Sequence, residues 1–483
     1  LKGSRNKVIS IIGDGAMTAG MAFEGLNQTG GLKPKNFIII LNDNAMSISK
    51  NVGAFSSYLS RIISAKSYNE IKDDIEELVL KIPSLGSKFM NIGRKIQESV
   101  KHLFIPGAIF EELGLRYFGP INGHDLGELI SILYKIKEID GPILLHVITK
   151  KGKGFHPAES DPTKFHGLGK FNKDTGASSK SCDGKSYSAV FGETLTKIAE
   201  NDKEIIAITA AMAPGTGLDI FAEKYPDRFF DVGIAEQHAV TFAAGLALGG
   251  YKPVVAIYSS FMQRAYDQVI HDIALQNLPV KIFMDRAGLV GEDGETHQGM
   301  FDISFMRAVP NLVFMAPKDG IEFQNMIFTA LKYNAGPIAV RYPRGNVKEC
   351  LPDNNYSEIP IGEGEVLAEG KDATIIAIGK MVEKAMKVRE FLLKKSLDVG
   401  VINARFIKPL DEKLLLSAGK KNKPVITLED NTLTGGFGTA VNSLFIENGI
   451  VDLKILNLGL PDKFIEHGTL DELFKLLNLD DES

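Results

Sequence analysis

The sequence contains only two cysteines among its 483 residues, Cys182 and Cys350. Two cysteines cannot build a disulfide framework or a cysteine-based zinc site, and a reducing compartment is the simplest expectation. A chain of this length can bury a large apolar core without disulfides or a structural metal. Packing of apolar side chains is therefore expected to stabilise the fold.

An excess of basic residues is also missing, because 55 Lys and Arg stand against 60 Asp and Glu, a net charge of −5. A general electrostatic nucleic-acid binder would be basic, so no nucleic-acid partner is predicted. The longest apolar run, about Ala239 to Gly250, is well short of the ~18 residues of a membrane span, and no membrane partner is predicted. Hydrophobic residues make up 44% and charged residues 24%, which excludes disorder as the dominant state.

Short β-branched runs alternate with longer helical patterns along the whole chain, which is typical of parallel α/β architecture. At roughly 150 residues per domain the length predicts about three such domains in tandem. Linker-like composition at 171–185 and at 352–362 separates them. The expected strands are Val8–Ile12, Phe37–Leu41, Ile143–Thr149, Ile205–Thr209, Phe229–Val232, Val254–Tyr258, Val280–Asp285, Leu312–Ala316, Ile338–Arg341, Ala373–Ile378, Val399–Asn403, Val425–Leu428 and Leu453–Leu458.

The predicted domains are residues 1–175, 186–350 and 364–483. The first is expected to be incomplete at its start, since an apolar run begins almost at once, at Val8, and no initiator Met precedes it. The chain is therefore expected to be part of a longer polypeptide. The expected helices are one or more within Tyr58–His102, together with Met21–Gln28, Ala235–Leu248, Phe261–Gln276 and Gly320–Tyr333.

Oxygen-bearing side chains follow the first two predicted strands, both expected to be buried. Gly13-Asp14-Gly15-Ala16 comes after the first, and Asn42-Asp43-Asn44-Ala45-Met46 after the second. Parallel strands would deliver Asp14 and Asn44 to the same ligand-binding edge of the sheet. With the Met46 carbonyl they suit Mg²⁺, while Gly15 and Ala16 would let a diphosphate approach a helix N-terminus. Taken singly, each run also fits an ordinary turn.

A carboxyl group opens an otherwise apolar helix in the second third of the chain. Glu236 follows the strand Phe229–Val232 and precedes Ala239 to Ala247. A helix that is apolar all round is expected to be buried, so the carboxyl needs a partner or a raised pKa. One interpretation is that the carboxylate interacts favourably with the helix dipole. The other is that it forms a hydrogen bond to a cofactor nitrogen, which is the expected partner because no Lys or Arg lies close in the sequence.

Aromatic and basic residues gather beyond this helix. Tyr258, Phe261 and Arg264 are three residues apart and should point one way at a helix start. Arg286 and Arg344 follow strands, where their planar guanidinium groups fit a phosphate or carboxylate, although a single arginine more often forms a surface ion pair. A glycine-rich loop with Asp293 and His297 lies between them.

The combined pattern resembles the 1-deoxy-D-xylulose-5-phosphate synthase family of transketolase-class thiamine diphosphate enzymes. The resemblance spans nearly the whole chain, and its most specific pieces are Ile-Ala-Glu-Gln-His-Ala at 234–239 and Asp-Arg-Ala-Gly-Leu-Val-Gly at 285–291. The matching runs are Gly13–Ala16, Asn42–Ser49, Gly119–Asp125, Lys150–Phe155, Asp231–Ala244, Tyr258–Asp267, Asp285–Asp302 and Arg341–Gly345.

The resemblance implies a fold of two thiamine-diphosphate-binding-type domains followed by a transketolase C-terminal-type domain. It implies condensation of pyruvate with D-glyceraldehyde 3-phosphate, release of CO₂ and formation of 1-deoxy-D-xylulose 5-phosphate. That product enters the non-mevalonate isoprenoid route and also feeds thiamine and pyridoxal synthesis. The family resemblance further implies thiamine diphosphate and Mg²⁺ as cofactors, a homodimer and a cytoplasmic location.

Site roles also follow from the resemblance, residue by residue. Mg²⁺ would bind Asp14, Asn44 and the Met46 carbonyl, and the cofactor would contact Gly15, Ala16, Asn44, Lys151, Phe155, Glu236 and Phe261. Glu236, His297 and Arg264 would be catalytic. The substrates would meet Tyr258, Arg264, Arg286, Asp293, His297 and Arg344; a plain loop histidine is the alternative for His297.

Four other interpretations are open. Transketolase and the decarboxylating component of a 2-oxo-acid dehydrogenase share the cofactor, but the latter usually splits its halves over separate chains. A nucleotide-binding oxidoreductase lacks support, because Gly436-Phe437-Gly438 does not continue as the dinucleotide pattern. Family members carry a further segment before Gly13 with active-site histidines, so an inactive fragment or a non-catalytic binding protein is the last alternative.

Overall fold

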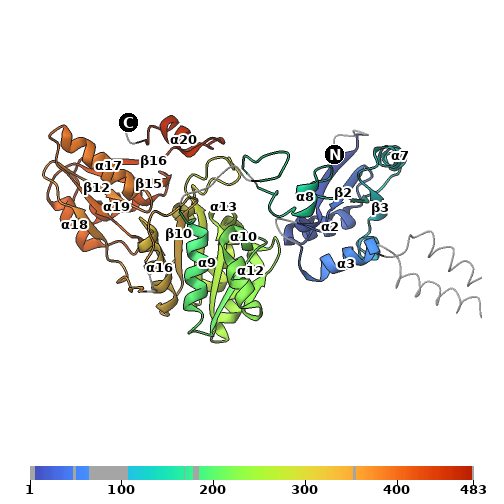
Figure 1. Cartoon of the computed structure of the whole chain (residues 1–483), viewed down its shortest axis with the longest axis horizontal. Helices are drawn as coiled ribbons and strands as arrows, with labels where there is room; N and C mark the ends of the chain where they lie inside the picture. Colours follow the sequence, from blue (N-terminus) through green and yellow to red (C-terminus); the bar gives the residue numbers. More distant parts are fainter. Residues whose placement is uncertain are drawn as a thin grey trace, which may run out of the picture. The chain divides into compact units, whose positions relative to one another are not determined.

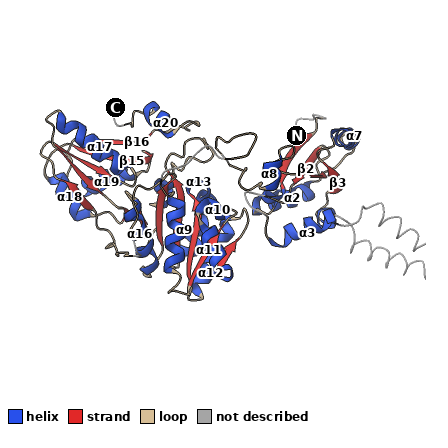
Figure 2. Ribbon diagram, in the orientation of Figure 1, coloured by secondary structure: helices blue, strands red, loops and turns tan. Residues whose placement is uncertain are grey.

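The computed structural model describes residues 6–46, 51–64, 107–167, 169–177, 184–351 and 355–480. The chain divides into two compact units, coloured along the sequence in Figure 1. Unit 1 comprises Leu1–Lys180 with Gly233–Ala235, and unit 2 comprises Ser181–Val232 with Glu236–Ser483. Helices alternate with strands throughout both units, as Figure 2 shows, and this confirms the predicted α/β class.

Unit 1 is built on a four-stranded parallel sheet in the order β1-β2-β4-β3. Alternate side chains of β2 and β4 enter two separate apolar clusters, one with Ile39, Leu41 and Leu144, the other with Ile38 and Leu145. Period-two alternation therefore buries both faces of these central strands. The strands are β1 (Val8–Gly13), β2 (Phe37–Asp43), β3 (Arg116–Asn122) and β4 (Ile143–Ile148), and the helices are α1 (Asp14–Met17), α2 (Gly20–Leu32), α3 (Gly53–Ser64), α6 (Ala108–Glu112), α7 (Leu126–Ile136) and α8 (His156–Ser160).

Strand β1 corrects one expectation. It was predicted to be buried, but Val8 is 56% and Ile11 72% exposed, because β1 lies at the edge of the described sheet and is covered little by the described residues. Strand β3 was not predicted, since Pro120 interrupts its apolar pattern. Of the helical stretch expected at 58–102, α3 covers the part up to Ser64, and the rest lies outside the described residues.

Unit 2 contains a seven-stranded sheet in the order β14-β9-β10-β8-β7-β5-β6. All its neighbours are parallel except the pair β14 and β9, in which residues beyond 400 add an antiparallel edge strand. The strands are β5 (Ile205–Thr209), β6 (Phe229–Asp231), β7 (Lys252–Tyr258), β8 (Lys281–Ala287), β9 (Val313–Met315), β10 (Ile338–Pro343) and β14 (Phe406–Lys408).

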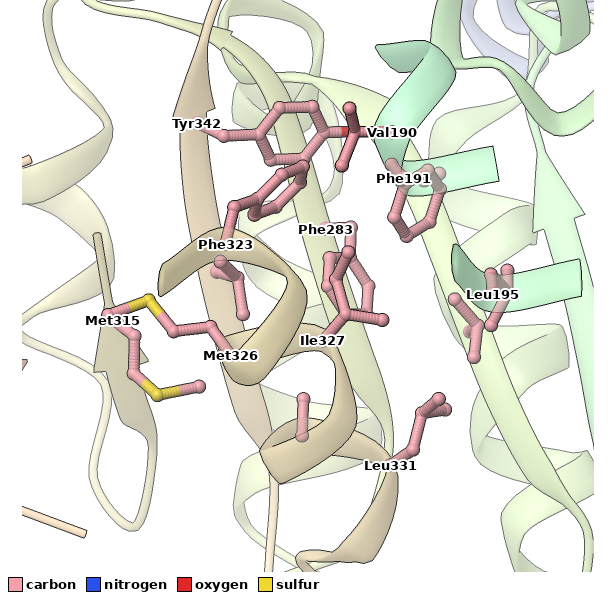
Figure 3. Packing of buried hydrophobic residues seen from close by; sticks show 14 of the residues in the cluster. Val190, Phe191, Leu195, Phe283, Met315, Phe323, Met326, Ile327, Leu331 and Tyr342 are labelled. Carbon is pink, nitrogen blue, oxygen red and sulfur yellow. The ribbon is translucent and has the colours of Figure 1, made fainter. Parts of the chain in front are cut away.

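Helices cover this sheet with a core rich in aromatic side chains. The rings of Phe323 and Tyr342 lie 4.5 Å apart between centroids, and those of Phe191 and Phe283 4.7 Å apart. Figure 3 shows these rings meeting the aliphatic side chains of α9 and α16. The helices are α9 (Tyr187–Ile198), α10 (Ala213–Thr216), α11 (Leu218–Lys224), η1 (Pro226–Arg228), α12 (Glu236–Leu248), α13 (Ser259–Met262), η2 (Gln263–Ala265), α14 (Tyr266–Gln268), η3 (Val269–Ala274), α15 (Asp302–Met306) and α16 (Gly320–Lys332).

A second sheet of unit 2 has five strands in the order β11-β13-β12-β15-β16. Only β11 runs antiparallel to its neighbour. Its apolar cluster includes Leu289 and Met300, so the glycine-rich loop after β8 packs against this layer. The elements are β11 (Glu365–Ala368), β12 (Ala373–Ala377), α17 (Met381–Lys394), β13 (Val399–Asn403), α18 (Glu412–Lys420), β15 (Val425–Thr432), α19 (Phe437–Glu447), β16 (Ile455–Leu460) and α20 (Leu470–Leu476).

Two helix predictions in unit 2 were wrong in part. The helix α12 is not buried all round: Ala239, Val240 and Ala243 are buried, whereas Leu248 is 66% exposed. The continuous helix expected at 261–276 is divided among α13, a 3₁₀ turn, α14 and the π-helix η3, because Ala265 leaves the helical region with φ −109° and ψ 13°. Among the described helices, none is long and apolar enough to cross a bilayer.

Candidate active site

In unit 1, the strands β1 and β2 bring Asp14 and Asn44 together. The two strands pair in register up to Gly13 and Asn42, so each of the two side chains follows its strand at the same edge of the sheet. The main-chain N–H groups of Gly15 and Asn44 donate to the Asp14 carboxylate, and Asn51 Nδ2 donates to its Oδ2 at 2.7 Å. The Met46 N–H donates to Asn44 Oδ1 at 3.1 Å, which closes the loop that carries the remaining predicted metal ligand.

The charge at this edge favours a cation. Asp14 is 3% exposed and lies beside Asp43, which is 1% exposed. Burial and the neighbouring Asp43 raise the pKa of Asp14 to about 7. Two buried carboxyl groups in contact either share a proton or need a cation to compensate their charge. The donor set, carboxylate and amide oxygens, therefore fits a hard divalent cation, although the described residues contain no cluster of three acidic, His or Cys ligands.

The predicted diphosphate contacts lie near the same edge. Gly15 and Ala16 are in the first turn of α1, with Gly15 O accepting from Thr18 Oγ1 at 2.7 Å. Burial lowers the pKa of Lys151, while Asp14 acts in the opposite direction, so the lysine lies within the field of that carboxyl. Its Nζ contacts His166 Nδ1 at 2.5 Å, a histidine that the sequence interpretation did not single out.

Phe155 has aromatic neighbours instead of an open face. Its ring centroid lies 5.6 Å from that of Phe165, at 82°, and 5.8 Å from that of Phe171, at 38°. The contact with Phe165 is edge-to-face, a favourable arrangement. Phe155 therefore packs in an aromatic cluster with Phe165 and Phe171.

In unit 2, the buried acid Glu236 has a cationic partner. Its side chain is 3% exposed, and Arg264 Nη1 donates to its Oε2 at 2.8 Å. Burial raises the pKa of Glu236, and Arg264 offsets part of this effect. The expectation that a cofactor nitrogen is the best available partner for this carboxyl is therefore incomplete. The turn η2 places the Arg264 guanidinium beside Glu236, although the two residues are 28 positions apart in the sequence.

Aromatic side chains gather just before Arg264 in the sequence. The Tyr258 and Phe261 rings are 5.5 Å apart between centroids, and the Phe261 and His297 rings are 5.2 Å apart at 65°. Burial raises the pKa of Tyr258 to about 12, so this phenol is neutral at physiological pH. Burial also lowers the pKa of His297, an effect that Arg286 and Arg344 reinforce and Asp293 opposes.

Two of the three predicted substrate arginines, Arg286 and Arg344, converge on one carboxylate. Arg286 Nη1 and Arg344 Nη1 lie 2.8 Å and 2.9 Å from Asp293 Oδ2. The Arg286 guanidinium also lies over the Tyr258 ring, 4.0 Å from its centroid, and Arg344 donates to Val290 O at 3.0 Å. Guanidinium groups so arranged form a binding place for an oxyanion.

This arrangement is supported by Asp285, Ser188 and Gln298, none of which was predicted. Arg286 has φ +61°, a left-handed conformation that is costly for a non-glycine residue. The main-chain N–H of Arg286 donates to the buried Asp285 carboxylate at 2.7 Å, and the Ser188 hydroxyl donates to the same carboxylate at 2.6 Å. The amide of Gln298 bonds Val290 N at 2.8 Å and the carbonyl of Glu466 at 3.3 Å, which ties the loop to the five-stranded layer. Only contacts between distant segments reveal these roles.

The sequence matches three family models in succession. Residues 1–149 match the model for 1-deoxy-D-xylulose-5-phosphate synthase, residues 183–349 the transketolase pyrimidine-binding domain, and residues 362–483 the transketolase C-terminal domain. The chain is 52% identical over 469 residues to the 1-deoxy-D-xylulose-5-phosphate synthase of Desulforudis audaxviator, covering 97% of this chain and 73% of that protein. It is 51% identical over 480 residues to the synthase of Halothermothrix orenii, covering 99% and 75%.

The chain belongs to the 1-deoxy-D-xylulose-5-phosphate synthase family. This confirms the resemblance drawn from the sequence motifs. Solved structures agree on the fold: a transketolase from Pichia stipitis matches with a TM-score of 0.53 at 16% identity, over 99% of this chain and 75% of that one. A split-gene transketolase, described as an inactive β4 tetramer, matches with a TM-score of 0.55 at 28% identity, over 62% of this chain and 95% of that one.

Proposed function

We propose that the chain catalyses the reaction for which its family is named, the condensation of pyruvate with D-glyceraldehyde 3-phosphate to 1-deoxy-D-xylulose 5-phosphate and CO₂. The observation that carries the proposal is the convergence of Arg286 and Arg344 on one carboxylate oxygen of Asp293. A site that holds an internal carboxylate with two guanidinium groups can hold a phosphate in its place. The enzyme is a transferase of the transketolase class.

Thiamine diphosphate is the cofactor of this class, and when bound it supplies a thiazolium carbanion that adds to a ketone. Asp14, Asn44 and the Met46 carbonyl would hold Mg²⁺, and the main chain at Gly15 and Ala16 would face the diphosphate. Lys151 and Phe155 would contact it from the loop before α8. The buried Asp14 and Asp43 carboxyls support this proposal, because a cation would compensate their charge.

Glu236 would hold a proton at the aminopyrimidine ring, beside Phe261. Burial raises its pKa, so its carboxyl binds a proton more readily than an exposed glutamate does, while the charge of Arg264 acts in the opposite direction. These opposing effects act on a group that must both hold and release a proton. Arg264 thus influences the proton affinity of Glu236 and also borders the substrates.

Arg286 and Arg344 would bind the acceptor phosphate, with Tyr258 beneath Arg286 restricting where that guanidinium can move. Asp293 would compete with the phosphate and give way when it arrives. The lowered pKa of His297 favours its neutral imidazole, which would accept a proton from a substrate hydroxyl group. Binding energy from the remote phosphate would thereby orient the reacting aldehyde.

Further parts of the proposal rest on the family or, for the domain limits, on the composition of the sequence. We propose a homodimer, a cytoplasmic location and participation in terpenoid and thiamine synthesis. We also propose the domain limits 1–175, 186–350 and 364–483.

The test is product analysis of the purified chain with thiamine diphosphate and Mg²⁺. Pyruvate with D-glyceraldehyde 3-phosphate should yield 1-deoxy-D-xylulose 5-phosphate by NMR, whereas ketose phosphate donors without pyruvate should yield none. Product from the ketose donors would favour transketolase. Cofactor binding without any product would favour a non-catalytic chain.

A further inference from the structure

A histidine lies fully buried in the apolar strand β4 of unit 1. His146 has no solvent exposure, and its neighbours in the strand, Leu145 and Val147, belong to the apolar core. Its Nε2 is 2.9 Å from Asp43 Oδ2, and its Nδ1 is 2.7 Å from the hydroxyl oxygen of Tyr117. Three adjacent strands, β2, β4 and β3, thus supply one chain of polar side chains through the core.

The direction of these hydrogen bonds follows from their ends. The Asp43 carboxylate accepts the Ala45 N–H at Oδ1, and its Oδ2 lies 2.9 Å from His146 Nε2. Burial raises the pKa of Tyr117, which keeps its hydroxyl protonated. One arrangement satisfies all three groups: Nε2–H donates to the Asp43 carboxylate, and Nδ1 accepts from the Tyr117 hydroxyl.

Asp43 connects this hydrogen-bond network to the predicted metal ligands. Its carboxylate is hydrogen-bonded to the side chain of Asp14, and its Oδ1 accepts the Ala45 N–H at 3.1 Å. Ala45 lies between Asn44 and Met46 and has φ +59°, a left-handed conformation that needs support from its surroundings. One carboxylate therefore fixes both the acidic ligand and the loop with the other two.

We infer that His146, backed by Tyr117, is a positioning residue for the cation and diphosphate site, holding Asp43 and through it Asp14 and the loop 44–46. The inference rests on the proposed metal site in unit 1. Hydrogen-bonded partners of metal ligands orient those ligands, and their loss typically costs about 10- to 100-fold in metal affinity. The three residues contact neither substrate nor cofactor in this scheme.

The test measures Mn²⁺ affinity by electron paramagnetic resonance, with thiamine diphosphate present and no substrate. His146→Leu should weaken Mn²⁺ binding by about 10-fold or more, whereas His146→Gln, whose amide can place an N–H near the position of Nε2, should restore most of the affinity. Tyr117→Phe keeps the ring and removes only the hydroxyl, so it should give an intermediate loss.

Leu145→Val is the matched control, because Leu145 is equally buried on the same strand but faces the other core cluster. It should lower the melting temperature without changing Mn²⁺ affinity. Wild-type affinity in His146→Leu, or an equal loss in His146→Gln and Leu145→Val, would overturn the inference. If His146→Leu fails to fold, Tyr117→Phe decides, and an unchanged affinity there would also overturn it.

This outcome is separable from the proposed function. A wild-type chain that binds Mn²⁺ with thiamine diphosphate but forms no 1-deoxy-D-xylulose 5-phosphate would refute the proposed reaction and leave the positioning inference standing if the variants behave as expected. A wild-type chain that binds no Mn²⁺ would overturn the inference together with the metal site.

Discussion

At the scale of single residues, the chemistry of the site comes from charges that meet across long stretches of chain. Glu236 was recognisable from the sequence because a carboxyl group at the start of an apolar helix is costly to bury without a partner. Its partner Arg264 was named as a separate candidate, but their contact depends on the path of α13 and η2. Sequence spacing identified the groups, and only the fold shows which of them neutralise one another.

Replacement of Glu236 by Gln tests its role directly. Glutamine keeps the shape of the side chain but cannot carry the proton, so exchange of the thiazolium proton should fall by at least about 10²-fold, the scale of lost acid–base catalysis. Hydrogen–deuterium exchange followed by NMR measures that step. Affinity for thiamine diphosphate should stay within a few-fold of wild type, and exchange at the wild-type rate would assign Glu236 to the helix dipole alone.

The arginine pair predicts a selective loss of acceptor binding. Arg286→Ala or Arg344→Ala should cost about 1.5–3 kcal/mol in kcat/KM for D-glyceraldehyde 3-phosphate, the scale of a hydrogen bond to a charged group. The KM for pyruvate should change little. Lys348→Ala, which removes an exposed ion pair with Glu383, is the control and should leave both unchanged. Equal losses for both substrates would make the arginines structural.

At the scale of elements, the strands were predictable because buried parallel strands are continuous apolar runs. Two of the strands that were not predicted have identifiable causes. Strand β3 contains Pro120, and β14 has only three residues and is defined by its pairing with β9. The network of Asp43, His146 and Tyr117 was not foreseen, although a histidine in an otherwise apolar strand is a visible signal for one.

The start of α19 shows why a glycine-rich segment need not bind a nucleotide. The main-chain N–H groups of Phe437 and Gly438 donate to the Glu429 carboxylate at 2.7 Å and 2.8 Å. A Cβ at Gly436 would lie 2.4 Å from Glu429 Oε2, so glycine is required for this close approach. An internal carboxylate thus occupies the place that a phosphate takes in dinucleotide-binding loops.

This buried glutamate predicts a pH dependence of stability. Burial raises the pKa of Glu429 to about 7 from 4.5, so the folded state binds its proton more tightly than the unfolded state. Stability from this group is present at low pH and is lost as the pH rises from about 4.5 to about 7. Relative to Glu429→Gln, the wild-type free energy of unfolding should fall by up to about 3 kcal/mol over that window.

Urea unfolding of both proteins at several pH values measures this difference. The fluorescence or circular dichroism midpoint of the variant should vary less steeply between pH 5 and 7 than that of the wild type. Parallel curves would show that Glu429 ionises in the folded state as an ordinary glutamate does.

At the scale of the whole molecule, the two sheets of unit 2 are joined through a buried charge cluster. Arg341 on β10 is 2% exposed; its Nε lies 2.9 Å from Asp302 Oδ2, and its Nη1 lies 2.6 Å from Asp430 Oδ1 on β15. Strand β14 crosses between the layers in the same unit, since it precedes α18 but pairs with β9. Gly288 passes directly over Asp430, where a Cβ would lie 2.0 Å from Oδ2.

Removing the cation of this cluster should uncouple the two layers. Arg341→Met removes the guanidinium that both Asp302 and Asp430 contact, and only Lys380 remains to act on Asp430, so the broken buried pair should cost about 3–5 kcal/mol. Because Arg341 belongs to the seven-stranded sheet and Asp430 to the five-stranded sheet, the loss should weaken the attachment of the two sheets more than either core. Calorimetry should therefore show one unfolding transition of unit 2 in the wild type and two in the variant.

A second variant distinguishes uncoupling from general damage. Adding Asp302→Asn and Asp430→Asn to Arg341→Met removes the unpaired charges and keeps the side-chain volumes, so much of the lost stability should return and the two transitions should approach each other. The cluster would then act mainly by charge compensation between the sheets. If the triple variant is no more stable than Arg341→Met alone, the contribution of Arg341 comes from packing and hydrogen-bond geometry, and the electrostatic account of how the layers are joined is wrong.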